Sequence, residues 1–158
     1  SCFEEETFSI ASKLTDFTFE KIMPTIPQEK ILFDFLSREK FKISHKKMPT
    51  FEEHVKFVRN HPYRGWWLIV DSANTSNVIG SIYASYDNSL GLKIELDRIN
   101  FTASFFIHKL KCLISPLDPE PSKIYGDFFY NVSPVNKDLI NWLSESGYYK
   151  SQISLSPK

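Results

Sequence analysis

The chain has 158 residues, 42% hydrophobic and 24% charged, a composition typical of one folded globular domain, and it excludes the disordered and fibrous classes of protein. Its 19 Lys and Arg balance its 19 Asp and Glu, so the formal net charge of +0 gives no electrostatic argument for binding nucleic acid or an anionic membrane. We therefore expect a single domain over residues 1–158, with residues 1–15 as a loose N-terminal segment.

The sequence also lacks the usual signals for a membrane or secreted location. Its longest uncharged runs are far shorter than the roughly 20 apolar residues of a membrane-spanning helix, and acidic residues stand near the N-terminus where a secretory signal carries basic ones. The two cysteines, Cys2 and Cys112, have no metal-ligand spacing and make a doubtful disulfide pair. We expect a cytoplasmic protein that contacts no membrane, with Cys112 buried in the core.

In the first third of the chain, the pattern predicts one strand and two helices. Residues Phe17–Ile22 alternate apolar and polar positions, as in a half-buried strand. After Pro27, apolar residues at 31, 32, 35 and 36 form one face of a helix. Thr50 and Glu53 have the spacing of a capping box, so a second helix should begin there and end at Asn60.

The middle of the chain predicts an antiparallel meander. Three apolar runs, Trp66–Val70, Val78–Ala84 and Leu90–Leu96, are separated by short polar turns. Short turns of this kind join neighbouring antiparallel strands.

The last third predicts two further helices and two strands. These are a helix in Phe101–Ile114, a strand in Lys123–Val132, a helix in Val135–Ser146 ended by Gly147, and a strand in Tyr148–Leu155. The whole order predicts an α+β fold with mixed α/β layers, built on one central, mostly antiparallel sheet flanked by about four helices.

This element order, together with three local stretches, resembles the GNAT superfamily of acyl-CoA N-acyltransferases, and more closely the bacterial amino-sugar N-acetyltransferases. The resemblance covers nearly the whole chain from about Phe17 onward. The stretches are His45–Val58 with Pro62–Ile69, then Val78–Tyr83, and finally Pro134–Asn136 leading to Gly147–Tyr148.

The resemblance implies a coenzyme site at the turn after the fourth strand. In the superfamily, a Gln/Arg-x-x-Gly-x-Gly/Ala segment turns backbone N–H groups toward the pyrophosphate of acetyl-CoA at a helix N-terminus. Here Arg98 and Ala103 match its ends, but Phe101 replaces the central Gly, so the pyrophosphate loop is degenerate. The N–H groups of this turn should face a cleft between the fourth and fifth strands. The residues expected to bind the coenzyme are Leu96, Arg98, Phe101, Thr102, Ala103, Ser104 and Asn136.

The resemblance also suggests where acid and base groups would stand. Many members use a tyrosine on the last helix as the acid, and Leu143 occupies that position here. Tyr148 and Tyr149 offer phenols nearby, and Tyr148 is the candidate acid; the alternative is that these tyrosines are core or rim residues at the start of a strand. Glu95 or Asp97 is the candidate base; the alternative is that both are ordinary solvent-facing charges on the strand. The four histidines form no metal set and are expected to be surface or capping residues.

Three functions remain open at this point. The first is acyl-CoA-dependent N-acetylation of a small primary amine, with activity weakened by Phe101 and Leu143. The second is a catalytically degenerate domain of the same fold that binds a ligand or a protein partner. The third is an interaction module, suggested by the aromatic residues Tyr63, Trp66, Trp67, Tyr83 and Tyr86.

Overall fold

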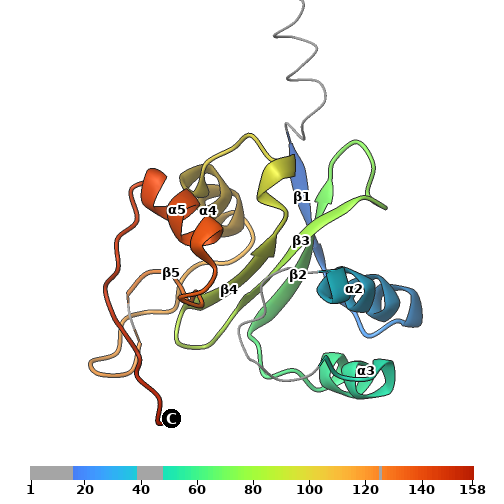
Figure 1. Cartoon of the computed structure of the whole chain (residues 1–158), viewed down its shortest axis with the longest axis horizontal. Coiled ribbons are helices and arrows are strands. Elements are labelled where there is room, and N and C mark those ends of the chain that lie inside the picture. The colour runs from blue at the N-terminus through green and yellow to red at the C-terminus, as the bar shows by residue number, and fades with distance from the viewer. Residues whose placement is uncertain (1–15, 39–47, 125) are drawn as a thin grey trace, which may run out of the picture.

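The computed structural model describes residues 16–38, 48–124 and 126–158, and the expected loose segment 1–15 lies outside them. In this part of the chain one five-stranded sheet has the order β1-β2-β3-β4-β5 (Figure 1). Its strands are β1 Phe17–Lys21, β2 Gly65–Asp71, β3 Val78–Ala84, β4 Ser89–Ile94 and β5 Phe129–Tyr130. The helices are α2 Ile26–Arg38, α3 Phe51–Arg59, α4 Ala103–Lys111 and α5 Lys137–Glu145, with a 3₁₀ turn, η1, at Leu96–Arg98.

The predicted meander is confirmed. Strands β1 to β4 pair antiparallel with their neighbours, and β5 pairs parallel with β4. The fold is therefore the expected α+β arrangement of a mostly antiparallel sheet with helices. No helix of the described residues is both long enough and apolar enough to cross a membrane.

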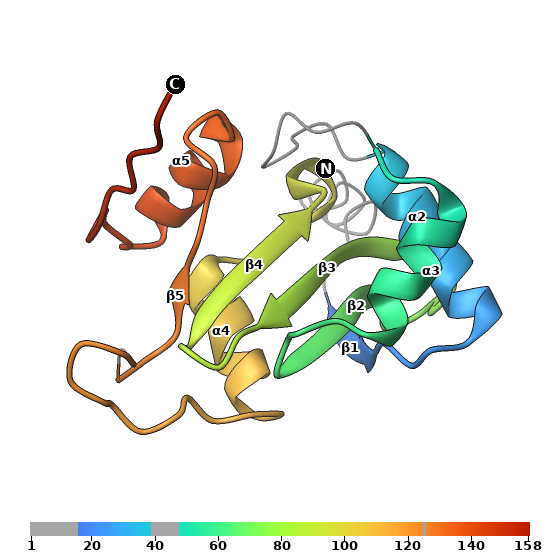
Figure 2. The same ribbon diagram turned by 90° about the horizontal axis from the view of Figure 1, so that it is seen from below.

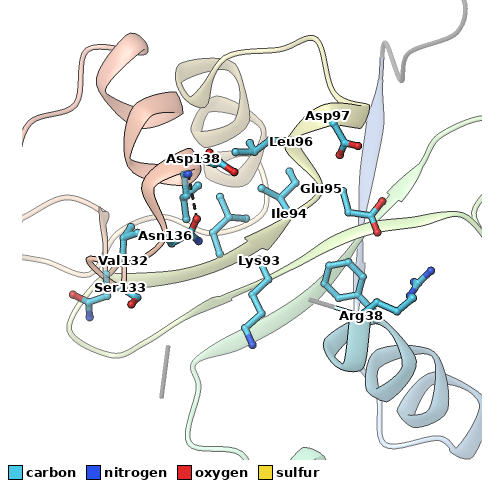
Figure 3. A pocket seen from close by; sticks show the side chains of 14 residues that line it. Arg38, Lys93, Ile94, Glu95, Leu96, Asp97, Val132, Ser133, Asn136 and Asp138 are labelled. Carbon is cyan, nitrogen blue, oxygen red and sulfur yellow. Dashed lines mark hydrogen bonds between the residues drawn. The ribbon is translucent and has the colours of Figure 1, made fainter. Parts of the chain in front are cut away.

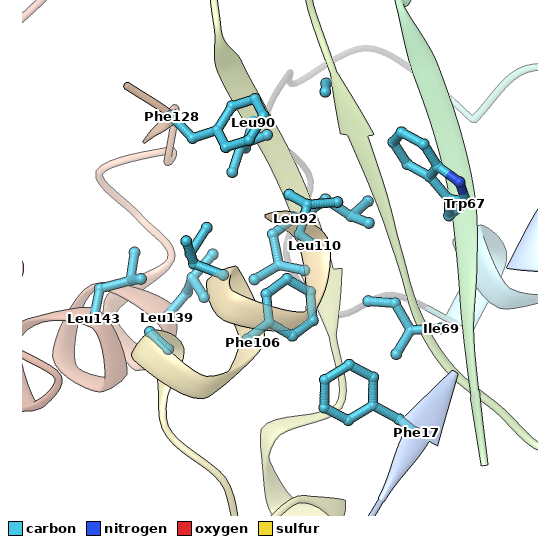
Figure 4. Packing of buried hydrophobic residues seen from close by; sticks show 14 of the residues in the cluster. Phe17, Trp67, Ile69, Leu90, Leu92, Phe106, Leu110, Phe128, Leu139 and Leu143 are labelled. Carbon is cyan, nitrogen blue, oxygen red and sulfur yellow. The ribbon is translucent and has the colours of Figure 1, made fainter. Parts of the chain in front are cut away.

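The helices cover both faces of the sheet in pairs (Figure 2). Helices α2 and α3 lie on one face, where Leu32, Phe35 and Val58 pack against alternate residues of β2. Helices α4 and α5 lie on the other face, and Figure 4 shows Phe106 and Leu110 of α4 packed between the sheet and α5. Each face of the sheet thus has its own hydrophobic core.

Local sequence signals explain where the helices begin and end. The Thr50 side chain accepts the Glu53 N–H at 3.2 Å, and the Glu53 carboxylate accepts the Thr50 N–H at 3.1 Å. These two bonds confirm the capping box. At the end of α5, Gly147 has a φ of 91°, and the Tyr148 N–H donates to the Leu143 carbonyl at 3.0 Å. This is a Schellman motif, with glycine at the left-handed position.

Two predicted strands are wrong in whole or in part. The strand expected in Lys123–Val132 is reduced to Phe129–Tyr130, because its first residues belong to a turn that is closed by the bridge between Glu120 and Ile124, with Ser122 at a φ of 63°, and residues 126 and 127 bend. No strand is found in Tyr148–Leu155, where Tyr149 and Leu155 are largely exposed. A strand needs a neighbour with which to pair, and the two residues of β5 offer a very short edge.

Two predictions about single residues are also wrong. Cys112, expected in the core, is exposed, because α4 ends at Lys111 and the Cys112 cap faces outward. His54, expected at the surface, is buried, and its Nε2–H donates to the Glu29 carbonyl at 3.1 Å. His45 lies outside the described residues.

Candidate functional site

The parallel strands β4 and β5 share only two residue pairs before they separate, Ser89 with Phe129 and Leu90 with Tyr130. Beyond them the sheet opens into a cleft of about 370 Å³, bounded by β4 and the η1 turn, by the segment from β5 into α5, and by the end of α2 (Figure 3). The expected cleft between the fourth and fifth strands is therefore present. Its size is at the lower end of ligand pockets, about 300–1,000 Å³.

Charged side chains gather around this cleft. Figure 3 shows Asp138 on the α5 side, Arg38 on the α2 side, and Glu95 and Asp97 where β4 ends. Lys93 points away from β4 between the two walls. The cleft is therefore lined by three carboxylates and two cationic side chains, so its lining is charged and of mixed sign.

Glu95, the candidate base, lies at the edge of the cleft and is partly buried. One of its carboxylate oxygens accepts a hydrogen bond from Arg98 at 2.9 Å, so it is not an isolated surface charge. Glu95 follows the end of β4 at Ile94 rather than standing on the strand as expected, because the chain turns into η1 there. Asp97 lies within η1 and is exposed.

Arg98, expected at the coenzyme, is turned toward the start of β3. Its guanidinium donates to Glu95 and to the Asn77 side chain, and reaches the Val78 carbonyl at 3.5 Å. These partners lie on the β2–β3 turn and at the strand end, away from the N-terminus of α4. In this arrangement the positive charge of Arg98 is paired with the Glu95 carboxylate.

The N-terminus of α4 is in contact with the end of α5. Thr102 caps α4 by accepting the Phe105 N–H at 3.4 Å, and the buried Ala103 donates its N–H to Ser146 Oγ at 3.0 Å. Ser104 Oγ donates to the Ser146 carbonyl at 3.4 Å. The expectation that the N–H groups of this turn face the cleft therefore does not hold for Ala103, which is bonded to α5.

Phe101, in the place of the family glycine, belongs to a cluster of aromatic rings. Its ring centre lies 4.4 Å from that of Phe17 and 6.2 Å from that of Phe106, and its carbonyl accepts the Trp142 indole N–H at 3.3 Å. No residue from 98 to 104 lines the cleft. Of the residues expected to bind coenzyme, only Leu96 and Asn136 line the cleft. Asn136 also caps α5 by accepting the Leu139 N–H at 3.3 Å.

The candidate acid, Tyr148, does not line the cleft. It follows α5, and its ring packs edge-on against Tyr130 with ring centres 5.6 Å apart. Burial, with a smaller effect of the Asp127 carboxylate, raises the pKa of Tyr148 above its ordinary value. Leu143, at the family's tyrosine position, is a buried core residue.

The structure adds cleft residues that the sequence analysis missed. Arg38 and Lys93 stand on α2 and β4, and Asp138 is two residues after Asn136 in the first turn of α5. The position of Asp138 was a usable signal, because the cleft was expected near Asn136. Arg38 had no such signal, since only the tertiary fold brings α2 to the edge of β4.

A second hollow of about 420 Å³ lies on the face of the sheet covered by α2 and α3, and Leu92 and Lys93 line both hollows. Aromatic side chains dominate its wall. Tyr63 and Tyr83 stack with ring centres 3.8 Å apart, and burial raises the pKa of Tyr63 to about 12. Of the aromatic set proposed for an interaction module, Trp66 and Trp67 are buried and Tyr86 is well exposed, so the set does not form one surface patch.

Among the described residues, no three His, Cys, Asp or Glu side chains come together as a possible metal site.

The fold has clear counterparts among solved structures. An acetyltransferase from Thermus thermophilus is 14% identical, with a TM-score of 0.54 over 82% of this chain and 86% of the other. The chain has the GNAT fold. An aminoglycoside acetyltransferase from an uncultured soil metagenomic sample is 8% identical, with a TM-score of 0.54 over 90% and 95% of the two chains. A spermidine N-acetyltransferase from Vibrio cholerae is 10% identical, with a TM-score of 0.52 over 86% and 81%. No family model and no curated protein sequence matches the chain.

The GNAT fold implies acetyl-CoA, and the residues at the α4 N-terminus can be tested against it. A pyrophosphate needs free N–H groups and a close approach to the backbone. Here the Ala103 N–H is bonded to Ser146, and the rings of Phe101 and Trp142 lie beside it. This end of the site does not fit the pyrophosphate group.

Proposed function

We propose that this chain transfers an acyl group from a thioester to a small primary amine in the cleft between β4 and β5. The observation that carries the proposal is the cleft itself, with Glu95, Asp97 and Asp138 around it in a GNAT fold. Spermidine and aminoglycosides, named for two of the structural neighbours, are amines of this general kind.

The carboxylates have two tasks in this proposal. A primary amine is protonated near neutral pH, so an ammonium ion that enters the cleft can pair with a carboxylate of its lining, such as Asp97 or Asp138. It must then lose a proton before its nitrogen can attack a carbonyl carbon. We assign this proton to Glu95 Oε1, because Glu95 Oε2 is bonded to Arg98, which holds the carboxylate at the edge of the cleft.

The aromatic hollow offers room for the rest of the amine. It adjoins the cleft at Leu92 and Lys93, so a molecule whose amino group lies near Glu95 can place an apolar or ring-shaped body against Tyr63 and Tyr83. Face-on contact of aromatic rings with cations or other rings is favourable. The two hollows together thus suit an amine larger than ammonia or methylamine.

The test is thiol release from a thioester in the presence of a panel of amines: a polyamine, an amino sugar, an aminoglycoside and an arylalkylamine. Acetyl-CoA is the donor in one series and S-acetyl-N-acetylcysteamine in a second. We expect Glu95→Gln to lower kcat/KM by about 10²-fold, the lower end of the range for general base catalysis. Glu145→Gln, an exposed carboxylate on α5, is the matched control and should leave the rate unchanged. Equal rates for both variants would remove Glu95 from the proposal.

A second function is favoured by two observations. The contact between α4 and α5 and the buried Leu143 remove two features that acyl transfer uses in this fold, so a domain that binds amines without transfer is the alternative. Amine binding measured by calorimetry without any thiol release would establish this alternative and reject the first.

A further inference from the structure

The end of α5 closes the N-terminus of α4 through the hydroxyl of Ser146. This hydroxyl accepts the Ala103 N–H at 3.0 Å and donates to the Trp142 carbonyl at 2.9 Å, so both of its hydrogen-bonding roles are used within the protein. Gly147 makes this possible, because its left-handed conformation ends α5 with Ser146 placed against α4. A phosphate placed here must break the Ser146 contact and find its own donors.

Aromatic rings fill the space beside this contact. Phe101 packs on Phe17, and its carbonyl accepts the Trp142 indole N–H at 3.3 Å, so Phe101 joins α4, α5 and β1. Moving the Phe101 ring aside exposes apolar area that is now shared among several rings, which costs about 25 cal/mol per Å². The closure is therefore built into the hydrophobic core and not limited to one hydrogen bond.

The charges near the closure are also unfavourable for a diphosphate. Arg98 is neutralised by Glu95 and directed toward Asn77, and the exposed Asp97 carboxylate follows directly on Leu96 at the end of the cleft. Like charges at short distance repel. A nucleotide diphosphate at this end meets the Asp97 carboxylate, and Arg98 is already paired with Glu95.

The cleft itself stays open. Its volume is about 370 Å³. It is lined along one side by the apolar residues Leu92, Ile94 and Leu96. This space suits the narrow thioester end of an acyl donor and the amino group of an acceptor.

We propose that the acyl donor of this chain is a thioester on a pantetheine-type arm that carries no nucleotide diphosphate. This inference rests on the proposed acyl transfer and identifies its donor. The amine nitrogen forms a bond to the thioester carbonyl carbon, and the C–S bond breaks with its electron pair leaving on sulfur. Glu95 takes the first proton from the ammonium ion before the attack, the second N–H proton passes to solvent as the amide forms, and the thiolate takes a proton from solvent. The arm is either free or attached to a carrier protein.

The experiment measures binding and transfer separately, on the whole chain. Calorimetry and amide chemical shifts are recorded with CoA, with pantetheine, with adenosine 5′-diphosphate and with a carrier protein bearing a phosphopantetheine arm. We expect CoA and pantetheine to bind within about threefold of each other, a difference below 1 kcal/mol. We also expect adenosine 5′-diphosphate not to bind, and the Ala103 amide signal to stay in place with every ligand. Carrier protein that binds more than tenfold tighter than pantetheine identifies a protein-borne arm, and equal affinities identify a free one.

The outcomes separate this inference from the proposed function. CoA binding more than tenfold tighter than pantetheine, or binding of adenosine 5′-diphosphate, overturns the inference and leaves acyl transfer standing. Pantetheine binding without acyl transfer from acetyl-pantetheine to any amine keeps the donor specificity and rejects the proposed function. Absence of binding by every ligand with a pantetheine arm rejects both.

A pair of variants tests the closure itself. Ser146→Ala frees the Ala103 N–H, which can then donate to a phosphate. We expect CoA affinity to rise at least threefold while pantetheine affinity is unchanged. Ser144→Ala, exposed on the same helix, should change neither. An equal gain for CoA and pantetheine, or none for CoA, would show that Ser146 does not exclude the nucleotide.

Discussion

The side-chain amide of Asn88 bonds both backbone groups of Leu117. Its Nδ2 donates to the Leu117 carbonyl at 3.0 Å, and its Oδ1 accepts the Leu117 N–H at 2.8 Å. Asn88 is buried in the turn between β3 and β4, with φ of 69°, and its carbonyl also accepts the Phe129 N–H at 3.2 Å. One residue thus holds the loop after α4 and the start of β5 against the meander.

Replacing Asn88 should therefore destabilise the fold without straining the turn. Asn88→Gly keeps the positive φ but leaves both Leu117 groups without the amide, and an unsatisfied buried group costs about 1–3 kcal/mol. We expect a loss of that order or more in the free energy of unfolding, measured with urea. Ser122→Gly, at the exposed position where φ is 63°, is the control and should be neutral or slightly stabilising. A neutral Asn88→Gly would mean that Leu117 finds other partners.

The ring of Tyr83 leaves no room for a side chain at Gly91. An added Cβ at Gly91 would lie 2.1 Å from two atoms of this ring, which is itself stacked on Tyr63 at 3.8 Å. Because the stack restricts movement of Tyr83, we expect Gly91→Ala to lower the free energy of unfolding by about 1–3 kcal/mol, as overpacking does. Gly126→Ala, whose Cβ would meet Pro119 at an ordinary 3.4 Å, should cost little. The urea midpoints of the two variants decide whether the ring can move.

The Schellman turn at Gly147 should tolerate asparagine better than alanine. The added Cβ of either residue has open space, so the cost comes from the backbone φ of 91° alone. The left-handed conformation costs an ordinary residue about 1–2 kcal/mol, and asparagine less. Thermal unfolding should place Gly147→Asn between the wild type and Gly147→Ala. Two variants of equal stability would argue for an adjustment of the turn.

Because of His54, the free energy of unfolding should decrease as the pH is lowered below neutrality. Burial is the main reason that the pKa of His54 lies below 6.5, although its bond to the Glu29 carbonyl and the Glu29 charge act in the other direction. The folded state favours the neutral ring, so below about pH 6.5 the unfolded chain takes up the proton first. The stabilisation is complete above that pH and is lost as the pH falls, by at most about 1.4 kcal/mol per pH unit.

Urea unfolding between pH 7.5 and 5 measures this effect. His54→Gln should flatten the pH dependence, whereas His108→Gln, on the exposed side of α4, should not. His61 contributes in the same direction, because burial, and then the Lys21 charge, lower its pKa too. A pH profile unchanged by His54→Gln would assign the effect to His61 or to the carboxylates.

The elements that the sequence predicted well have a strong local signal. The capping box at Thr50 and Glu53 and the glycine turn at Gly147 involve residues within a few positions of one another, so they can be recognised without knowing the fold. The meander was equally clear, because its turns are short. The alternation in Tyr148–Leu155 has the same local pattern but no partner strand, and pairing is a tertiary property.

For the site, the sequence indicated the position of the cleft but not its contacts. Arg98 and Ala103 match the family pattern by type, yet one is bonded to Glu95 and the other to Ser146, 43 residues away. Phe101 was recognised as a misfit, but its neighbours Phe17 and Trp142 come from distant parts of the chain. Such contacts depend on how α4, α5 and β1 pack together, which no local pattern reports.

The uneven pairing of the sheet has a consequence for the order of folding. Strands β2, β3 and β4 follow one another through short turns, so the meander can form with little loss of loop entropy. Strand β5 pairs with β4 only after α4 and the long loop beyond it have been placed. With two residue pairs, β5 gains little when it docks. In native-state hydrogen exchange the amides of Phe129 and Asn131, which bond to Asn88 and Leu90, should therefore open more readily than those of β3. The cleft wall would then be the last part of the sheet to form and the first to open.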